Sequence, residues 1–313
     1  MIKKIFLGLL VVLVIGFVAS YLLYASYRAE RFESLVENST LAETTAGLIE
    51  YQLVGDSGPV VLFLHGTPGG YDQTTVIDGF RVLSPSRPGY LRTPLAVGRT
   101  PAEQAHAYTD LLDALGVDKV LVMGASGGGP SAISFAAAYP ERTVALIAME
   151  AVSQPTNLTE EQGSPSFFME SDFFLWASLS LLDSFAGDEG IVGLLVPNPV
   201  IQQMILADPV KTEAITGLIW SIWPISQRGA GQQNDLTQFK ILSLPNNKVS
   251  VPTLIIHGTE DINVPFSQSQ QLAEQIPHAV LHTVEGGDHM MPFSHSEEVE
   301  LALEQFITTL SLE

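Results

Sequence analysis

The stretch KVLVMGASGGGPSAISFAAAY, residues 119–139, decides the fold. Its first part, Lys119 to Met123, is short, apolar and β-branched at two positions, which predicts a buried strand. Its last part is rich in alanine and predicts a helix. Between them Gly124, Ser126 and Gly128 form the pattern Gly-x-Ser-x-Gly. A strand that turns sharply into a helix needs glycines at this point, because a side chain beside the strained serine would clash.

In such a turn the hydroxyl group of Ser126 is exposed at the carboxyl edge of the sheet. A serine hydroxyl is a poor nucleophile at neutral pH, so it needs a histidine base and an acid that orients the base. Asp261 lies on a loop after the predicted strand 251–258, and His289 lies on a loop after the predicted strand 279–284. Loops at one edge of a parallel sheet converge, so we expect the three side chains to meet.

Four local motifs, within roughly residues 47 to 310, resemble the α/β-hydrolases that use a serine nucleophile. They are His-Gly-Thr-Pro-Gly-Gly at 65–70, Gly-Ala-Ser-Gly-Gly at 124–128, His-Gly-Thr-Glu-Asp-Ile-Asn-Val-Pro at 257–265 and Gly-Asp-His at 287–289. The resemblance implies an α/β fold with a mostly parallel central sheet, helices on both faces and a helical cap insert.

The resemblance also implies the roles of the site residues. Ser126 is expected to be the nucleophile, His289 the base and Asp261 the acid. Glu150, at the end of the predicted strand 142–149, is the alternative acid, because some members of the family carry the acid at that place.

An oxyanion hole is implied by the backbone N–H groups of Thr67 and Gly127. His65 and Gly66 belong to the same loop motif as Thr67, and His65 is expected to be structural. The chain departs from the family at residues 86–93, which read Ser-Arg-Pro-Gly-Tyr-Leu-Arg-Thr where an Asp-x-x-Gly-x-Gly-x-Ser run is frequent. This departure leaves the local loop geometry open.

The charge and composition of the chain limit the kinds of ligand and partner that we expect it to bind. The net charge is −20 at pH 7, which repels phosphate backbones and disfavours nucleic acid as a partner. The chain has no Cys, and none of its 7 His residues forms a pair with the spacing of a metal site, so no metal or other cofactor is expected. The sequence carries no signal for an oligomeric state.

The amino terminus predicts a membrane segment at residues 1–27. Lys3 and Lys4 precede an uncharged apolar run from Ile5 to Tyr27, which is long enough to span a bilayer as a helix. A cleaved signal peptide, with a small-residue site at 18–20, is the alternative and would give a secreted protein. The positive charges slightly favour a cytoplasmic amino terminus and an extracytoplasmic catalytic domain. Residues 28–46 are expected to form a polar linker.

The remaining chain is divided into a hydrolase core at 47–150 and 249–313 and a helical cap at 151–248. In the core, strands at 47–54 and 59–64 are expected to be joined by a hairpin-like turn, and Thr100 is expected to cap a helix. The cap is rich in large apolar residues, among them Phe167, Phe168 and all three tryptophans. These side chains are expected to line an apolar pocket, to pack the cap on the core, or to touch the membrane.

Together these features predict a serine hydrolase that cleaves carboxylic esters of apolar or lipid-like compounds, anchored to the membrane by its amino-terminal helix. The Thr67-Pro68-Gly69 loop is similar to that of prolyl aminopeptidases, so peptide cleavage is the first alternative. Carbon–carbon hydrolases share the same three residues and stay open. A ligand receptor with little turnover is a further alternative of a different class.

Overall fold

The computed structural model describes residues 2–156 and 171–310. Its strands are β1 (Thr40–Thr44), β2 (Gly47–Val54), β3 (Val60–Leu64), β4 (Arg81–Pro85), β5 (Val120–Ala125), β6 (Thr143–Met149), β7 (Thr253–Gly258) and β8 (Val280–Val284). Its helices are α1 (Ile2–Glu37), α2 (Pro101–Ala114), α3 (Gly129–Ala138), α5 (Asp172–Val192), α6 (Pro199–Leu206), α7 (Pro209–Ser221), α8 (Gly229–Lys240), α9 (Ser267–Gln275), α10 (Met291–Ser294) and α11 (Ser296–Thr308).

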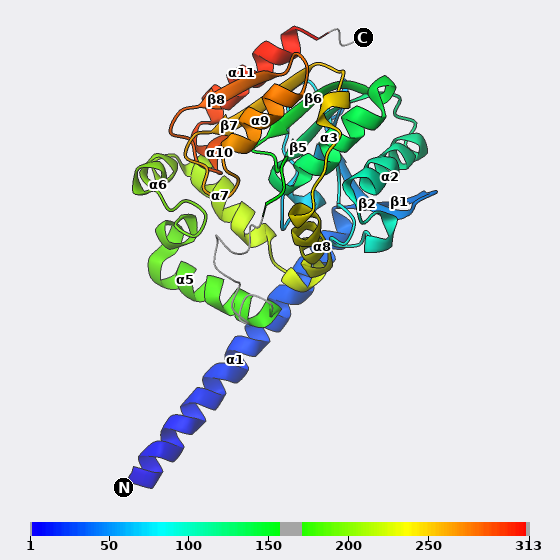
Figure 1. Ribbon diagram of the computed structural model, residues 1–313. Coiled ribbons are helices and arrows are strands. Elements are labelled where there is room, and N and C mark those ends of the chain that lie inside the picture. Colours follow the sequence, from blue (N-terminus) through cyan, green and yellow to red (C-terminus); the bar gives the residue numbers. More distant parts are fainter. Residues whose placement is uncertain (1, 157–170, 311–313) are drawn as a thin grey trace.

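The strands form one sheet in the order β1-β2-β4-β3-β5-β6-β7-β8. From β4 to β8 all neighbours are parallel, and only β2 runs against its neighbours β1 and β4. Helices cover both faces of this sheet (Figure 1). The predicted α/β architecture, a mostly parallel central sheet with helices on both faces, is therefore confirmed.

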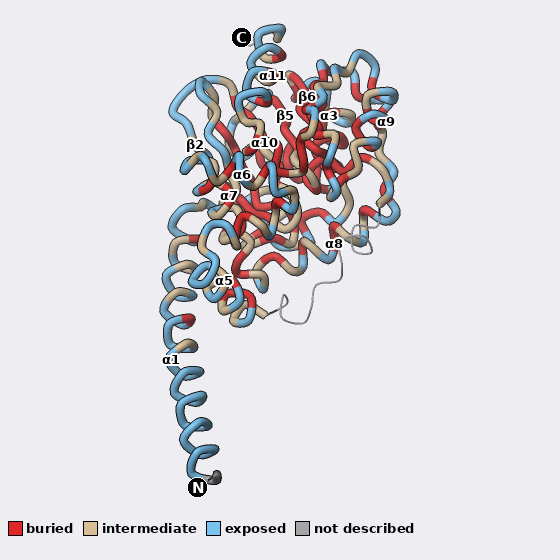
Figure 2. Tube along the Cα trace, turned by 90° about the vertical axis from the view of Figure 1, so that its left-hand side faces the viewer, coloured by how far each residue is buried: buried red, intermediate tan, exposed pale blue. Residues whose placement is uncertain are grey.

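The core consists of two apolar layers, one on each face of the sheet. Alternate residues of a strand point to opposite faces, and β5 shows this directly. Val120 and Val122 join the cluster formed with α2, α3 and α9, whereas Leu121 and Met123 join the cluster formed with α10 and α11. Figure 2 shows the resulting buried strands at the centre of the body. Burial on both faces fixes the strand positions and hence the loops at the carboxyl edge.

The linker predicted at residues 28–46 is wrong. α1 continues through Glu37, and Thr40–Thr44 forms the edge strand β1, which pairs antiparallel with β2. The segment is polar in composition, but apolar residues at intervals, such as Phe32 and the buried Leu35, pack it against the body. An edge strand tolerates polar residues because one of its sides is open to water.

The hairpin predicted between β2 and β3 is also wrong. β4 lies between the two strands, pairing antiparallel with β2 and parallel with β3. The turn at 55–58 does use glycines with positive φ, 91° at Gly55 and 96° at Gly58. β3 is almost fully buried, and a central position between β4 and β5 gives both of its edges parallel partners.

The cap segment holds α5, α6, α7 and α8, which lie on the side of the body from which α1 emerges (Figure 1). All three tryptophans of the chain contact α1. The rings of Trp176 and Tyr24 are 5.6 Å apart, and those of Trp220 and Trp223 are 5.8 and 5.1 Å from Tyr27. The tryptophans thus pack the cap against α1, while Phe167 and Phe168 lie outside the described residues.

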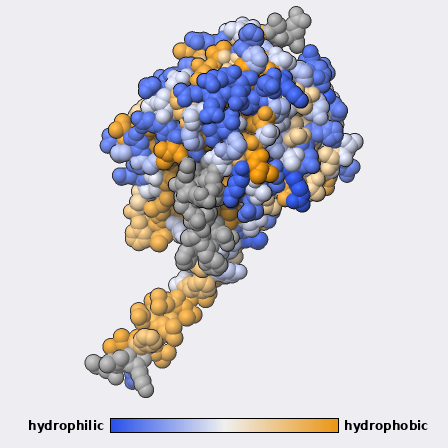
Figure 3. All heavy atoms as spheres, viewed as in Figure 1, coloured by the Kyte–Doolittle hydropathy of each residue, from blue (hydrophilic) through white to orange (hydrophobic). Residues whose placement is uncertain are grey.

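The amino-terminal part of α1 leaves the body altogether. Between Ile5 and Leu23 its large apolar side chains are about half to two-thirds exposed. Figure 3 shows this part as an apolar rod that extends from the body, whose visible surface is mostly hydrophilic apart from apolar patches, one of them near the rod. Its most apolar window has a mean hydropathy of 2.7, so by length and composition α1 is a candidate membrane span.

Candidate active site

Ser126 lies where β5 ends and α3 is about to begin, in one turn of 3₁₀ helix. Its φ is +48°, a left-handed conformation that a side-chain-bearing residue rarely adopts. The neighbouring glycines are required because a side chain at either position would clash. A Cβ on Gly124 would lie 2.6 Å from the Cβ of Ala132, and one on Gly128 would lie 2.1 Å from the carbonyl oxygen of Leu64. The strained turn presents the Ser126 hydroxyl at the carboxyl edge of the sheet.

The structure brings Ser126, His289 and Asp261 together, as the sequence predicts. His289 Nε2 is 3.1 Å from Ser126 Oγ, and His289 Nδ1 is 2.7 Å from Asp261 Oδ2. An ionised carboxylate only accepts hydrogen bonds, so Nδ1 carries the proton and Nε2 is free to accept one from the serine. Ser126 and His289 are partly exposed whereas the Asp261 carboxylate is fully buried. A substrate can therefore reach the hydroxyl but not the acid.

Asp261 is surrounded by donors. Its Oδ1 accepts hydrogen bonds from the backbone N–H groups of Asn263 and Val264, and its Oδ2 accepts from His257 as well as His289. Burial alone would raise the pKa of Asp261, but the hydrogen bonds from the two histidines outweigh it and lower the pKa well below its usual range. The carboxyl group is therefore ionised when the site works near neutral pH.

His257 is fully buried and also contacts Asp261, which the sequence did not predict. Its Nε2 lies 2.9 Å from the carbonyl oxygen of Val264 and 3.1 Å from Asp261 Oδ2, so this nitrogen carries the proton. Its Nδ1 then accepts a hydrogen bond from Ser269 Oγ at 2.6 Å. His257 thus fixes the position of the acid from behind.

Among the described residues, His289 pairs with Asp261 and has no hydrogen bond to Glu150, the alternative acid. Glu150 is buried at the end of β6 with a φ of +36°, and its Oε2 has no hydrogen-bond partner in the described part of the chain. Burial, reinforced by the charge of Asp261, raises the pKa of Glu150 well above its ordinary value. Burial at this place beside Asp261 therefore favours the protonated form of the Glu150 carboxyl group.

The two segments expected to form the oxyanion hole lie against each other beside Ser126. A Cβ added to Gly127 would lie 2.1 Å from Thr67 Oγ1, and one added to Gly66 would lie 3.3 Å from Ser126 Cβ. His65 is structural, as predicted. Its Nδ1 bonds the carbonyl oxygen of Gly66 at 2.8 Å, and its Nε2 accepts the backbone N–H of Arg87 at 3.0 Å.

A buried cluster around Asp235 supports the Thr67 loop and was not predicted. Asp235, on the cap helix α8, accepts hydrogen bonds from Thr67 Oγ1 at 2.5 Å and from Tyr90 OH at 2.6 Å. Arg87 donates to both carboxylate oxygens of Asp235, at 3.0 and 2.5 Å. Arg87 and Tyr90 belong to the stretch in which the sequence departs from the family. That departure was the available signal, but nothing in the local sequence indicates a partner in the cap.

Within residues 2–156 and 171–310, no group of three or more His, Asp or Glu side chains is arranged to hold a metal ion.

The chain is similar to the uncharacterized hydrolase YcgS of Bacillus subtilis, with 28% identity over 254 residues, 78% of this chain and 89% of the relative. It is similar to a 2-hydroxymuconate semialdehyde hydrolase of Pseudomonas putida, with 28% identity over 268 residues, 81% of this chain and 88% of the relative.

Among solved structures, the chain is similar to an alpha/beta hydrolase fold protein from Nakamurella multipartita. The two are 32% identical with a TM-score of 0.79, and the match covers 86% of this chain and 98% of the other. The model of the alpha/beta hydrolase family matches residues 61–302, which is most of the chain. The protein is therefore a member of the alpha/beta hydrolase family.

Proposed function

We propose that the protein is a serine hydrolase that cleaves carboxylic esters of apolar or lipid-like compounds through an acyl-enzyme. The observation that carries the proposal is the hydrogen-bonded chain in which His289 joins Ser126 Oγ, at 3.1 Å, to Asp261 Oδ2, at 2.7 Å. Both distances are within the reach that proton transfer to a general base requires.

In the proposed reaction Ser126 Oγ attacks the carbonyl carbon of the ester while His289 Nε2 takes the hydroxyl proton. The ionised Asp261 holds the ring in the required tautomer and stabilises the imidazolium. The N–H groups of Thr67 and Gly127 bind the oxyanion, and a donor in that position is worth about 3 kcal/mol in the barrier. His289 then gives its proton to the leaving alcohol, and a water molecule repeats the cycle on the acyl-enzyme.

Carbon–carbon hydrolysis is the second candidate. The chain is similar to a 2-hydroxymuconate semialdehyde hydrolase, and homologues of that kind act on carbon–carbon bonds. The same serine, histidine and aspartate are compatible with either bond. Two further alternatives, a peptidase and a ligand receptor with little turnover, rest on the sequence pattern alone.

A substrate panel separates these candidates. It contains p-nitrophenyl esters of graded acyl length, a vinylogous 1,5-diketone acid and an amide with amino-terminal proline, each tested on the wild type and on Ser126→Ala. We expect ester turnover that rises with acyl length and is lost in Ser126→Ala. Faster turnover of the diketone acid than of every ester would assign the enzyme to carbon–carbon hydrolysis instead.

We further propose that α1 anchors the enzyme in a membrane, with the catalytic domain outside the cytoplasm. The exposed run from Ile5 to Leu23 is about 28 Å long as a helix, close to the apolar thickness of a bilayer. Leu181 and Phe185 on α5 are 61% and 84% exposed, on a helix that contacts α1. These apolar side chains, exposed on a helix that contacts the anchor, support a lipid-like substrate.

Two measurements test the anchor. Amino-terminal sequencing of the mature protein should return the intact terminus, whereas a new terminus near residues 18–20 would indicate a cleaved signal peptide and a secreted enzyme. Protease added to intact cells should degrade the catalytic domain, and full protection would place that domain on the cytoplasmic side.

A further inference from the structure

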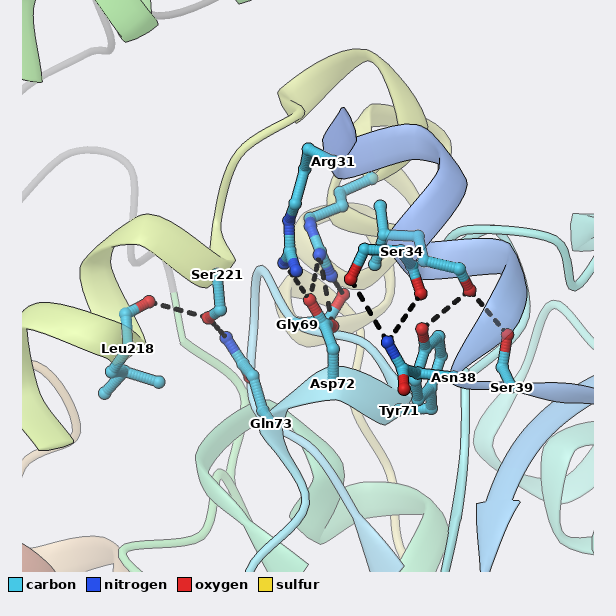
Figure 4. A network of polar contacts seen from close by, with 12 residues as sticks. Arg31, Ser34, Asn38, Ser39, Gly69, Tyr71, Asp72, Gln73, Leu218 and Ser221 are labelled. Carbon is cyan, nitrogen blue, oxygen red and sulfur yellow. Dashed lines mark hydrogen bonds and ion pairs between the residues drawn. The ribbon is translucent and has the colours of Figure 1, made fainter. Parts of the chain in front are cut away.

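The carboxyl-terminal half of α1 is bonded to the loop that carries Thr67. This loop runs from the end of β3 through Gly69 and Gly70 to the 3₁₀ turn Tyr71–Gln73. Figure 4 shows the loop residues and the side chains from α1 and the cap that reach them. The membrane-proximal helix is therefore attached to the segment expected to supply an oxyanion donor.

The first attachment is an ion cluster around Asp72. Arg31 on α1 and Arg228 in the cap both donate to the carboxylate, and the Arg228 contacts measure 3.1 and 2.8 Å. Arg228 also donates to the carbonyl oxygen of Gly69. The side chains of Arg228 and Asp72 are 0% and 9% exposed and that of Arg31 is 23% exposed. The shielded setting makes these charge-assisted hydrogen bonds strong and directional.

The second attachment is made by Tyr71, which is 1% exposed. Its hydroxyl donates to the carbonyl oxygen of Leu35 at 2.6 Å. Leu35 lies in the last turn of α1, where carbonyl groups have no partner within the helix and must find one outside it. The end of the helix and the loop thus satisfy each other's polar groups.

The loop between these attachments and Thr67 has little room to move independently. A Cβ on Gly69 would lie 2.3 Å from His65 Nδ1, and one on Gly70 would lie 2.5 Å from Arg228 Nη1 and 2.7 Å from Asp72 Oδ1. Packing this close transmits a displacement of Asp72 along the chain instead of absorbing it. The position of the Thr67 N–H group therefore depends on the contacts of Asp72.

We propose that Arg31 is a positioning residue for catalysis. Through Asp72, Arg31 holds the loop that carries Thr67 in the geometry that catalysis requires. The membrane-proximal half of α1 is therefore part of the catalytic apparatus. The inference rests on the proposed function, because it assumes that Thr67 stabilises an oxyanion. It separates α1 into two parts. Residues 5–23 serve the membrane, whereas the segment from Tyr24 to Leu35 serves the active site.

The test compares Arg31→Ala with the wild type as full-length protein in detergent micelles, using p-nitrophenyl esters. Displacing an oxyanion donor without removing it should lower kcat about 10-fold and leave KM within about twofold, because the ground-state carbonyl depends less on that donor. Arg31→Lys keeps the charge and should recover a large part of kcat. Asp72→Asn, which keeps the side-chain shape, should lower kcat at least as much as Arg31→Ala.

Arg28→Ala is the matched control. Arg28 lies one turn earlier on α1, and its guanidinium carbon is 4.3 Å from the ring centroid of Phe32; in the described part of the chain it has no hydrogen bond or ion pair with the loop. Its removal should leave kcat unchanged. A wild-type kcat in both Arg31→Ala and Asp72→Asn would overturn the inference, as would an equal loss in Arg28→Ala. Ser126→Ala in the same preparation tests the proposed function separately. Ester hydrolysis that survives in this variant would refute the serine mechanism, but it would not refute the positioning of the loop by Arg31.

Discussion

The assignment of Asp261 as the acid predicts a large loss of activity in Asp261→Asn. The asparagine oxygen can still accept the backbone N–H groups of Asn263 and Val264. Its amide group then faces the N–H groups of His257 and His289, so that donors meet donors. His289 can relieve the conflict by moving its proton to Nε2, and in that tautomer it cannot accept the serine proton.

A wrong tautomer of this kind lowers turnover by about 10⁴-fold, which corresponds to about 5 kcal/mol of transition-state stabilisation. The matched control is Glu150→Gln. Burial raises the pKa of Glu150, and its Oε2 has no partner in the described part of the chain, so the neutral amide should keep kcat/KM within about threefold. The assay is the initial rate of p-nitrophenyl ester hydrolysis across pH 6–9. An Asp261→Asn enzyme with more than a tenth of wild-type activity, or an equal loss in Glu150→Gln, would refute the reasoning.

Three further predictions follow from single contacts. Gly127→Ala places a methyl group 2.1 Å from Thr67 Oγ1, so the two segments of the proposed oxyanion hole must separate and kcat should fall on the order of 100-fold; an unchanged kcat would contradict this. The folded protein lowers the pKa of Asp261, so the stability that this group contributes is present above about pH 4 and is lost as the pH falls below it. Between pH 4 and pH 2 the free energy of unfolding, measured with denaturant, should fall less steeply in Asp261→Asn than in the wild type. An equal fall in both proteins would count against an ionised Asp261. Thr100→Ala breaks the capping box with Glu103 and should cost about 1 kcal/mol of unfolding free energy with no change in kcat, so a loss of activity would be unexpected.

The local sequence pattern was sufficient to predict those site residues whose positions depend on a single strand and the loop that follows it. Ser126 follows a buried strand and precedes a helix, and each of those elements has its own signal in the neighbouring residues. Asp261 and His289 each follow a strand end in the same way. Because parallel strands end at one edge, three separate local predictions were enough to bring these side chains together.

The features that the sequence did not predict depend on pairing between distant segments. Thr67 and Asp235 are 168 positions apart, and neither lies in a pattern that names the other. The order β2-β4-β3 was missed for the same reason, since a glycine turn at 55–58 is equally compatible with a hairpin and with a crossover. The polar composition of residues 28–46 concealed a helix end and an edge strand, because their stability comes from contacts such as Arg31 with Asp72 rather than from local propensity.

Covalent labelling tests the central claim most directly. A fluorophosphonate probe should react with the wild type at Ser126, located by mass spectrometry of the digested protein, and ester hydrolysis should fall in proportion to the labelled fraction. His289→Ala should label far more slowly, because the serine loses its base. Label on another residue, or full ester turnover by a protein fully labelled at Ser126, would contradict the account.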